Sequence, residues 1–176
     1  MPFVFVFAYA TFVRALRIPV RPMHSTTQSA IALLIFLACA FAAASTGYFF
    51  PPGEWYAGLE KPIFSPPNWV FGPVWTTLYV MMSVAAWLVW KETGWRARPI
   101  GLWFGQIALN ALWTPLFFGL HWLGIALVEM ALLWLLILLT LLSFRAVSRL
   151  ASWLMAPYLA WVSFAWFLNL SLWWLN

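Results

Sequence analysis

The chain has 176 residues, of which 65% are hydrophobic and only 7% charged, and its mean hydropathy is +0.90. Soluble domains carry about 25% charged residues, so this composition excludes a soluble enzyme and a disordered chain. The single cysteine excludes a disulfide scaffold. The length predicts one domain, with lipid as its solvent. The 15 tryptophans exceed what aromatic belts at the membrane interface usually require, so some of them need another explanation.

Apolar runs long enough to cross a bilayer, which takes about 20 residues each, predict an all-α membrane protein with five transmembrane helices. The predicted helices are Gln28–Gly47, Trp69–Trp90, Pro99–Phe118, Trp122–Phe144 and Leu150–Leu172. The third and fourth share a run that is too long for one helix, and Gly119–Gly124 is the natural break. A β-barrel is excluded because its strands would alternate in segments of about 10 residues, whereas these runs are continuous.

The basic residues lie singly or in small groups beside apolar runs, which indicates juxtamembrane anchors rather than a nucleic-acid surface. With five helices, one side of the membrane receives eight of them and the other receives only Lys61. The eight are Arg14, Arg17, Arg21, Lys91, Arg96, Arg98, Arg145 and Arg149. The positive-inside rule then predicts a bacterial cell membrane, with the N-terminus inside and the C-terminus outside.

Residues 1–27 form an N-terminal extension to the domain at 28–176. The arginines in the extension recur at helical spacing, which is typical of an interfacial amphipathic segment. Met23 serves equally well as a start site, in which case the extension is not translated. Both interpretations stay open, and no function is assigned there.

The first loop, Tyr48–Asn68, is the one long connection, and its five prolines make it stiff. Long ordered loops in compact domains are often lids. The other connections are short, which predicts antiparallel neighbours in a compact bundle.

Polar residues inside apolar helices are informative because lipid makes them costly. On the third helix Gln106, Asn110, Trp113 and Phe117 share one face at helical spacing. This spacing is equally typical of hydrogen bonds between helices and of ligand contact. Glu129 lies about 10 Å inside the fourth helix at 1.5 Å per residue, and without a nearby cation we interpret it as a neutral carboxyl or an interface contact.

Two further aromatic stripes complete the candidate site. The second helix places Trp75 and Tyr79 four residues apart, and the fifth places Trp161, Ala165 and Leu168–Asn169 on one face. One such stripe is more often bundle packing, but three on different helices suit a large planar apolar ligand. Motifs for nucleophilic, paired-carboxylate or metal catalysis are missing, and we expect His24 and His121 to be solvated loop residues.

Four ordered motifs resemble those of the tryptophan-rich sensory protein and translocator protein (TspO/MBR) family, also called the peripheral-type benzodiazepine receptor family. They are Trp55–Pro62, Pro66–Tyr79, Gln106–Phe118 and Pro157–Asn169. The resemblance covers about residues 30–170. It implies a five-helix bundle, usually a homodimer, with a ligand cavity beneath the first loop. The family binds porphyrins, haem, cholesterol and synthetic benzodiazepine-site ligands, so we expect porphyrin or haem as a ligand and no required cofactor or metal. Family members also occupy outer membranes and mitochondria, which are the alternatives to a bacterial cell membrane.

Carried over residue by residue, the cavity positions of the family fall on Trp75, Asn110, Trp161, Ala165 and Leu168. The resemblance implies a receptor or carrier for tetrapyrroles or sterol-like molecules, with a sensory, regulatory or transport role. The alternative is an enzyme of light-dependent porphyrin degradation, in which Trp75 and Trp161 are the catalytic residues. The Tyr and Arg that follow the Leu-Asn pair in animal members, as part of a cholesterol-recognition pattern, are missing after Leu168–Asn169.

Overall fold

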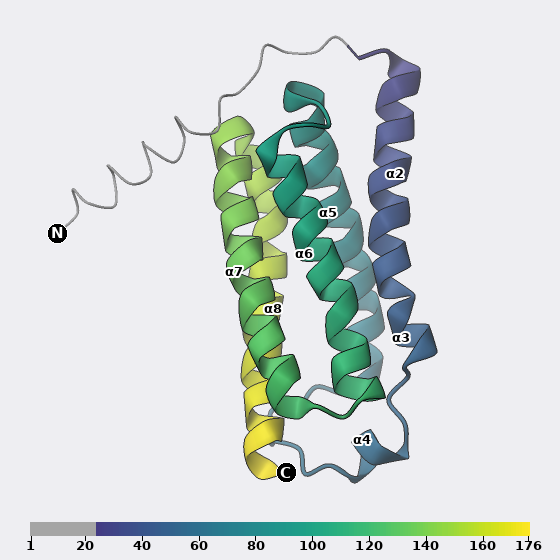
Figure 1. Cartoon of the computed structure of the whole chain (residues 1–176), viewed down its shortest axis with the longest axis vertical. Helices are drawn as coiled ribbons and strands as arrows, with labels where there is room; N and C mark the ends of the chain where they lie inside the picture. Colours follow the sequence, from purple (N-terminus) through teal and green to yellow (C-terminus); the bar gives the residue numbers. More distant parts are fainter. Residues whose placement is uncertain (1–23) are drawn as a thin grey trace, which may run out of the picture.

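The protein is described here from a computed structural model that covers residues 24–176. Its long helices run antiparallel as one bundle, and the C-terminus lies at the same end as the first loop (Figure 1). The predictions about the start site and about an amphipathic segment with Arg14, Arg17 and Arg21 lie outside the described residues.

The helices follow the predicted order, with short additional turns. The elements are α2 (Thr26–Ala44), α3 (Thr46–Phe49), α4 (Glu54–Gly58), the 3-10 turn η1 (Asn68–Val70), α5 (Phe71–Thr93), α6 (Arg98–Thr114), the π-helical turn η2 (Pro115–Gly119), α7 (Leu123–Val147) and α8 (Arg149–Leu175). Within residues 24–176, four helical segments are long and apolar enough to cross a membrane: Thr26–Phe49, Asn68–Thr93, Leu123–Val147 and Arg149–Leu175.

The fifth segment is α6, which has 17 residues and is extended by the five residues of η2. Together they reach about 30 Å, enough to cross the hydrocarbon core. The prediction of a five-helix bundle is therefore confirmed, as is the break after Gly119. The ends differ by a few residues, mainly because α5, α7 and α8 continue to Thr93, Val147 and Leu175.

Local sequence signals explain where these helices begin and end. Ser25 and Gln28 form a capping box at the start of α2, each side chain bonding to the backbone of the other residue. Ser148 accepts a hydrogen bond from the backbone N–H of Ala151 and caps α8. Gly94, at φ 74°, ends α5 in a left-handed conformation that favours glycine.

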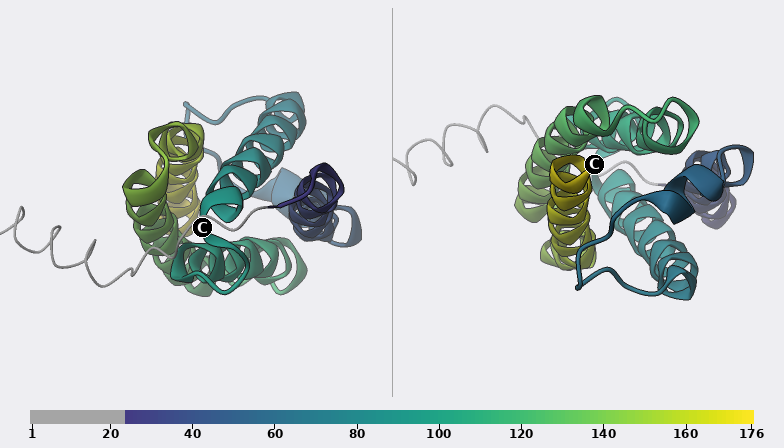
Figure 2. Two further views of the ribbon diagram at one scale, coloured as in Figure 1. Left: turned by 90° about the horizontal axis from the view of Figure 1, so that it is seen from above. Right: turned by 90° about the horizontal axis from the view of Figure 1, so that it is seen from below.

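The two end views in Figure 2 show α7 and α8 on one side of the bundle and α2 on the other. The most extensive contacts join α7 to α8 and α6, α2 to α5, and α5 to α8. Several tryptophans hold neighbouring helices together through their indole N–H. Trp103 donates to the Met82 carbonyl at 3.0 Å, and Trp134 donates to the Ser163 hydroxyl at 2.8 Å.

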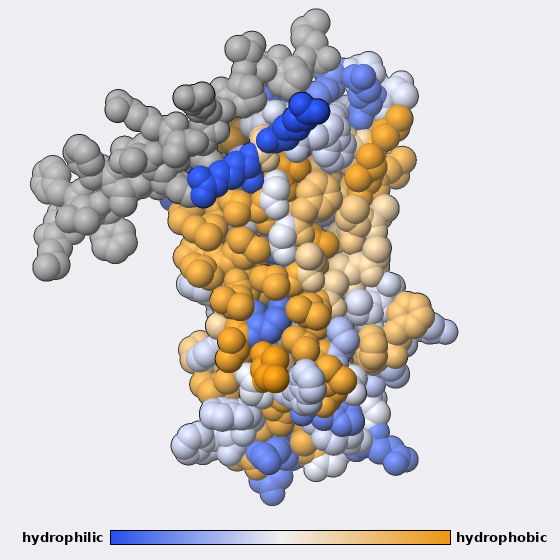
Figure 3. Space-filling view, in the orientation of Figure 1, coloured by the Kyte–Doolittle hydropathy of each residue, from blue (hydrophilic) through white to orange (hydrophobic). Residues whose placement is uncertain are grey.

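Tryptophans near the ends of helices differ in their surroundings. Trp87 donates to the Ser29 carbonyl at 2.9 Å and carries the Lys91 ammonium 3.8 Å above its ring. Trp90 is buried, whereas Trp95 and Trp122 are exposed. In Figure 3, apolar side chains cover the waist of the molecule and polar ones gather at its ends.

The ends of the bundle differ in charge. Lys91, Arg96, Arg98, Arg145 and Arg149 lie where α5 meets α6 and α7 meets α8, and Lys61 lies in the first loop at the other end (Figure 1). In the part of the chain that the structure describes, Lys61 therefore lies at one end of the bundle and the other basic residues lie at the opposite end, as the predicted topology requires. Which end faces the cell interior stays a prediction.

Candidate functional site

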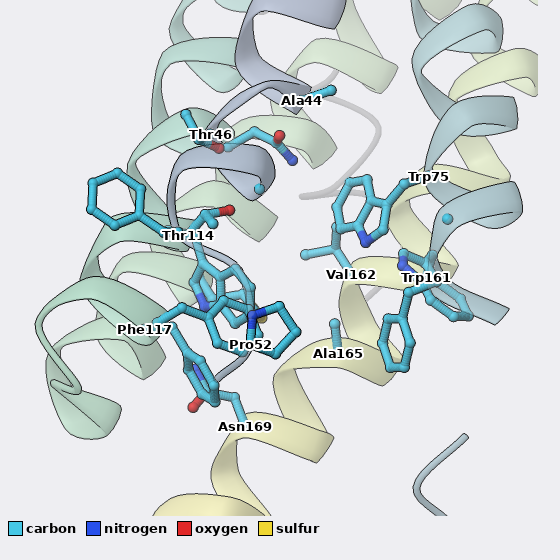
Figure 4. A pocket seen from close by; sticks show the side chains of 18 of the residues that line it. Ala44, Thr46, Pro52, Trp75, Thr114, Phe117, Trp161, Val162, Ala165 and Asn169 are labelled. Carbon is cyan, nitrogen blue, oxygen red and sulfur yellow. The ribbon is translucent and has the colours of Figure 1, made fainter. Parts of the chain in front are cut away.

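A cavity of about 560 Å³ lies at the first-loop end of the bundle. Helices α2, α3, α5, α6, α7 and α8, the turn η2 and the first loop all contribute to its wall. Figure 4 shows Trp75, Trp161 and Ala165 on one side and Thr114 and Phe117 opposite them. A space this large, with mainly apolar walls and a few polar groups, is typical of small-molecule sites.

The structure brings together eight of the nine predicted ligand-binding residues in this wall. They are Trp75, Tyr79, Asn110, Trp113, Phe117, Trp161, Ala165 and Leu168. Gln106 shares their helix face but lies one turn farther from the first loop, where the helices close together. It is fully buried, and its amide nitrogen lies 4.0 Å from the Met82 sulfur. The structure therefore places Gln106 outside the wall of this cavity.

Asn110 connects three helices through a buried hydrogen-bond network. The Tyr79 hydroxyl donates to Asn110 Oδ1 at 2.6 Å, and Asn110 Nδ2 donates to the Tyr158 hydroxyl at 3.0 Å. Tyr158 is fully buried and Tyr79 nearly so. Asn110 thus joins α6 to α5 and α8, as the interhelical interpretation of its spacing requires. It also lines the cavity, and its contact with a ligand stays a prediction.

Aromatic rings form the walls in offset and edge-to-face pairs, the arrangements that ring quadrupoles favour. The Trp75 ring stacks on Tyr79 with centroids 5.5 Å apart, and Trp113 stacks on Phe117 at 4.8 Å. The Trp161 ring meets Phe71 edge to face at 5.8 Å. The walls therefore present flat apolar surfaces held at fixed angles.

The first loop closes the end of the cavity and is held by residues distant in sequence. The Trp55 ring stacks on His121 with centroids 4.0 Å apart, and Tyr56 packs edge to face against Phe118. Burial raises the pKa of the Tyr56 phenol above its ordinary value of 10.0. These contacts agree with the predicted lid.

A latch formed by Asn176 and Glu60 secures the same loop. Asn176 Oδ1 accepts from the Glu60 backbone N–H at 3.0 Å, and Asn176 Nδ2 donates to the Glu60 carbonyl at 3.1 Å. The Asn176 amide also bonds to the Leu172 carbonyl at 3.0 Å, which fixes its orientation. The end of α8 is thus tied directly to the lid.

The histidines and Glu129 lie outside the cavity wall. His121 is exposed, as predicted, whereas His24 is half-buried and stacks on Trp90 with centroids 3.9 Å apart. Glu129 is 6% exposed, and among residues 24–176 neither of its carboxyl oxygens has a hydrogen-bond partner. Glu129 is therefore buried between helices with no hydrogen-bond partner among these residues, a position that does not favour a contact at an oligomer interface.

Sequence reasoning missed Tyr56 as a wall residue and Tyr158 as a hydrogen-bond partner of Asn110, and it named Asn169 only as part of the stripe on the fifth helix. Tyr158 lies one turn before Val162 on α8, so helical spacing from a wall residue would have found it. Asn169 is an amide within a transmembrane helix, and that alone is a signal of function. Tyr56 lies in the first loop, where helical periodicity does not predict which way a side chain points.

The fold and the site together define a multi-pass helical membrane protein with an aromatic cavity at the first-loop end of the bundle. The sequence profile of the TspO/MBR family matches residues 30–175, and the chain belongs to this family. It is 44% identical to protein CrtK of Rhodobacter capsulatus over 144 residues, 80% of this chain and 89% of that protein. It is 47% identical to the human translocator protein over 124 residues, 68% of this chain and 73% of the relative. A tryptophan-rich sensory protein of Cereibacter sphaeroides is 40% identical over 136 residues, 77% of this chain and 85% of the relative.

Proposed function

We propose that this protein is a membrane receptor or carrier that binds porphyrins, haem or sterol-like apolar molecules in the cavity beneath the first loop. The observation that carries the proposal is the cavity of about 560 Å³, with aromatic rings from several helices in its wall. Flat apolar ligands stack on such rings and need only a few polar contacts for orientation. The family resemblance and relatives named translocator protein and tryptophan-rich sensory protein support a transport or sensory role.

Further parts of the proposal rest on the family and on charge. We expect a homodimer in a bacterial cell membrane, with the end that carries Lys91 and Arg145 in the cytoplasm. The cavity then lies toward the outer surface, beneath a lid that faces away from the cell. Protein with a cysteine in the first loop, labelled on intact cells by a membrane-impermeant maleimide, tests this orientation. Labelling only after lysis would contradict it.

Quenching of tryptophan fluorescence by protoporphyrin IX tests the site. We expect saturable quenching by the wild type and weaker affinity in Trp161→Ala and Asn110→Ala, because both residues line the cavity. An exposed alanine on the lipid side of α8, Ala160, provides the control variant Ala160→Val. Unchanged affinity in both cavity variants would exclude this cavity as the binding site.

The second candidate function is light-dependent oxidative degradation of protoporphyrin IX. It is favoured by Trp75 and Trp161, two oxidisable indoles that line the same cavity from α5 and α8. We expect product formation to require illumination and oxygen, and to fall in Trp75→Phe and Trp161→Phe while binding is retained. Equal product formation by these variants and the wild type would rule out the enzymatic role.

A further inference from the structure

We propose that Asn169 is the polar anchor of the cavity and selects apolar ligands that present a hydrogen-bond donor beside an acceptor, as an undissociated carboxyl group does. The inference rests on the proposed function and narrows its ligand class to carboxyl-bearing tetrapyrroles. It starts from the position of Asn169 on α8, one turn beyond Ala165 (Figure 4).

The side chain of Asn169 is buried but makes no hydrogen bond to the described residues. Its side chain is 1% exposed and lines the cavity. Among the described residues, neither Oδ1 nor Nδ2 has a hydrogen-bond partner. A buried amide without partners is destabilising, and in lipid no bulk water is present to satisfy it. A group that arrives in the cavity supplies what the protein does not.

The other two buried amides in the described helices, Asn110 and Gln106, are accounted for differently. Asn110 is in the wall, but its Oδ1 and Nδ2 are engaged by Tyr79 and Tyr158. Gln106 has an unpartnered Oε1 in the described structure, but it lies outside the wall. Among the described residues, Asn169 is the buried amide that is in the wall and has no hydrogen-bond partner, whereas Asn68, which also lines the wall, is exposed.

The remaining polar atoms in the wall indicate which end of a ligand binds where. The indole N–H groups of Trp113 and Trp161 are buried without partners in residues 24–176, so they add donors but no acceptor. Asn169 lies eight residues beyond Trp161, about 12 Å along α8 toward the lid. Among the α8 residues of the wall, Asn169 is the one whose side chain offers a donor and an acceptor together, so a ligand that stacks beside Trp161 and extends along α8 meets this pair there.

The absence of cations favours a neutral group at this position. The lining residues in the described structure include no lysine, arginine or histidine. A buried carboxylate without a cation is costly, whereas an undissociated carboxyl donates to Oδ1 and accepts from Nδ2 at once. The acid side chains on the rim of a tetrapyrrole have this chemistry.

Three macrocycles that differ only at these side chains test the inference. The first is protoporphyrin IX, the second its dimethyl ester, which keeps acceptors but loses the donor, and the third carries alkyl groups in place of both acids. Each is titrated by fluorescence quenching against the wild type, Asn169→Leu and the matched amide variant Gln106→Leu. We expect the wild type and Gln106→Leu to bind the acid more tightly than the ester, and the ester more tightly than the alkyl compound.

In Asn169→Leu the affinity for the acid should fall at least about tenfold, because both hydrogen bonds to the amide are lost, while the alkyl compound binds as before. If Asn169→Leu still binds the acid more tightly than the ester, and the ester more tightly than the alkyl compound, the inference is overturned. Wild-type protein that binds acid and ester equally would also overturn it, whether or not the variant folds. If the wild type binds none of the three compounds, the proposed function fails and the inference with it.

Discussion

The network around Asn110 gives the most quantitative prediction for the stability of the bundle. Asn110→Leu removes the acceptor of the Tyr79 hydroxyl at 2.6 Å and the donor to the Tyr158 hydroxyl at 3.0 Å. Side-chain hydrogen bonds in membrane proteins contribute about 0.6 kcal/mol on average and at most about 1.7 kcal/mol. Because both bonds are short and buried, we expect a loss of about 1–3 kcal/mol in the free energy of unfolding.

A double-mutant cycle separates this network from simple changes in packing. The free energy of unfolding is measured in detergent micelles by titration with sodium dodecyl sulfate, with helix content as the signal. In the background Tyr79→Phe with Tyr158→Phe, Asn110→Leu should cost less than about 0.5 kcal/mol, because no hydroxyl is left without a partner. The same cost for Asn110→Leu in both backgrounds would refute the reasoning.

Three further predictions concern the cavity and its lid. Ala165→Phe places a ring in the cavity and should lower porphyrin affinity at least about tenfold, whereas the control Ala160→Phe on the lipid side should not lower it. Equal porphyrin affinities of the two variants in a quenching titration would contradict this prediction. Asn176→Ala removes both hydrogen bonds to Glu60 and should speed backbone hydrogen exchange in the first loop, while the free energy of unfolding changes by less than about 1 kcal/mol. Unchanged exchange would show that these bonds do not hold the loop. A Cβ at Gly119 would lie 2.7 Å from the ring of Phe50, so Gly119→Val should displace that ring. We expect the ligand dissociation rate, measured by stopped-flow quenching, to rise severalfold. An unchanged rate would show that the first loop adapts without opening.

The helices could be predicted because their signals are local. Lipid requires continuous apolar segments of fixed length, and the charged or glycine-rich breaks between them are visible in the sequence. Ser25 and Ser148 act on residues three positions away, and the break at Gly119 ends a helix that is already long enough. On α5 and α8, residues that helical spacing predicts on one face, such as Trp75 and Tyr79 or Trp161 and Ala165, do line the same cavity in the structure.

The lid could be predicted only as a stiff loop. Prolines restrict its backbone, but they do not indicate where it packs. Its position depends on contacts between distant residues, such as the stacking of Trp55 on His121 and the bonds between Glu60 and Asn176, which are 116 positions apart. No local pattern encodes such pairs, so the tertiary structure had to provide them.

The three amides of the bundle show why helical spacing alone does not identify a binding residue. Gln106 and Asn110 share a face, and only depth separates an amide packed near Met82 from one in the cavity wall. Asn110 and Asn169 are both in the wall, and they differ in whether neighbouring side chains use their hydrogen-bonding atoms. That difference follows from two tyrosines on other helices, Tyr79 and Tyr158. An amide that the protein satisfies holds the scaffold together, and an amide that it leaves unsatisfied in a cavity is available to a ligand. The search for ligand contacts in such bundles therefore depends on the partners of each polar atom more than on which helix face carries the residue.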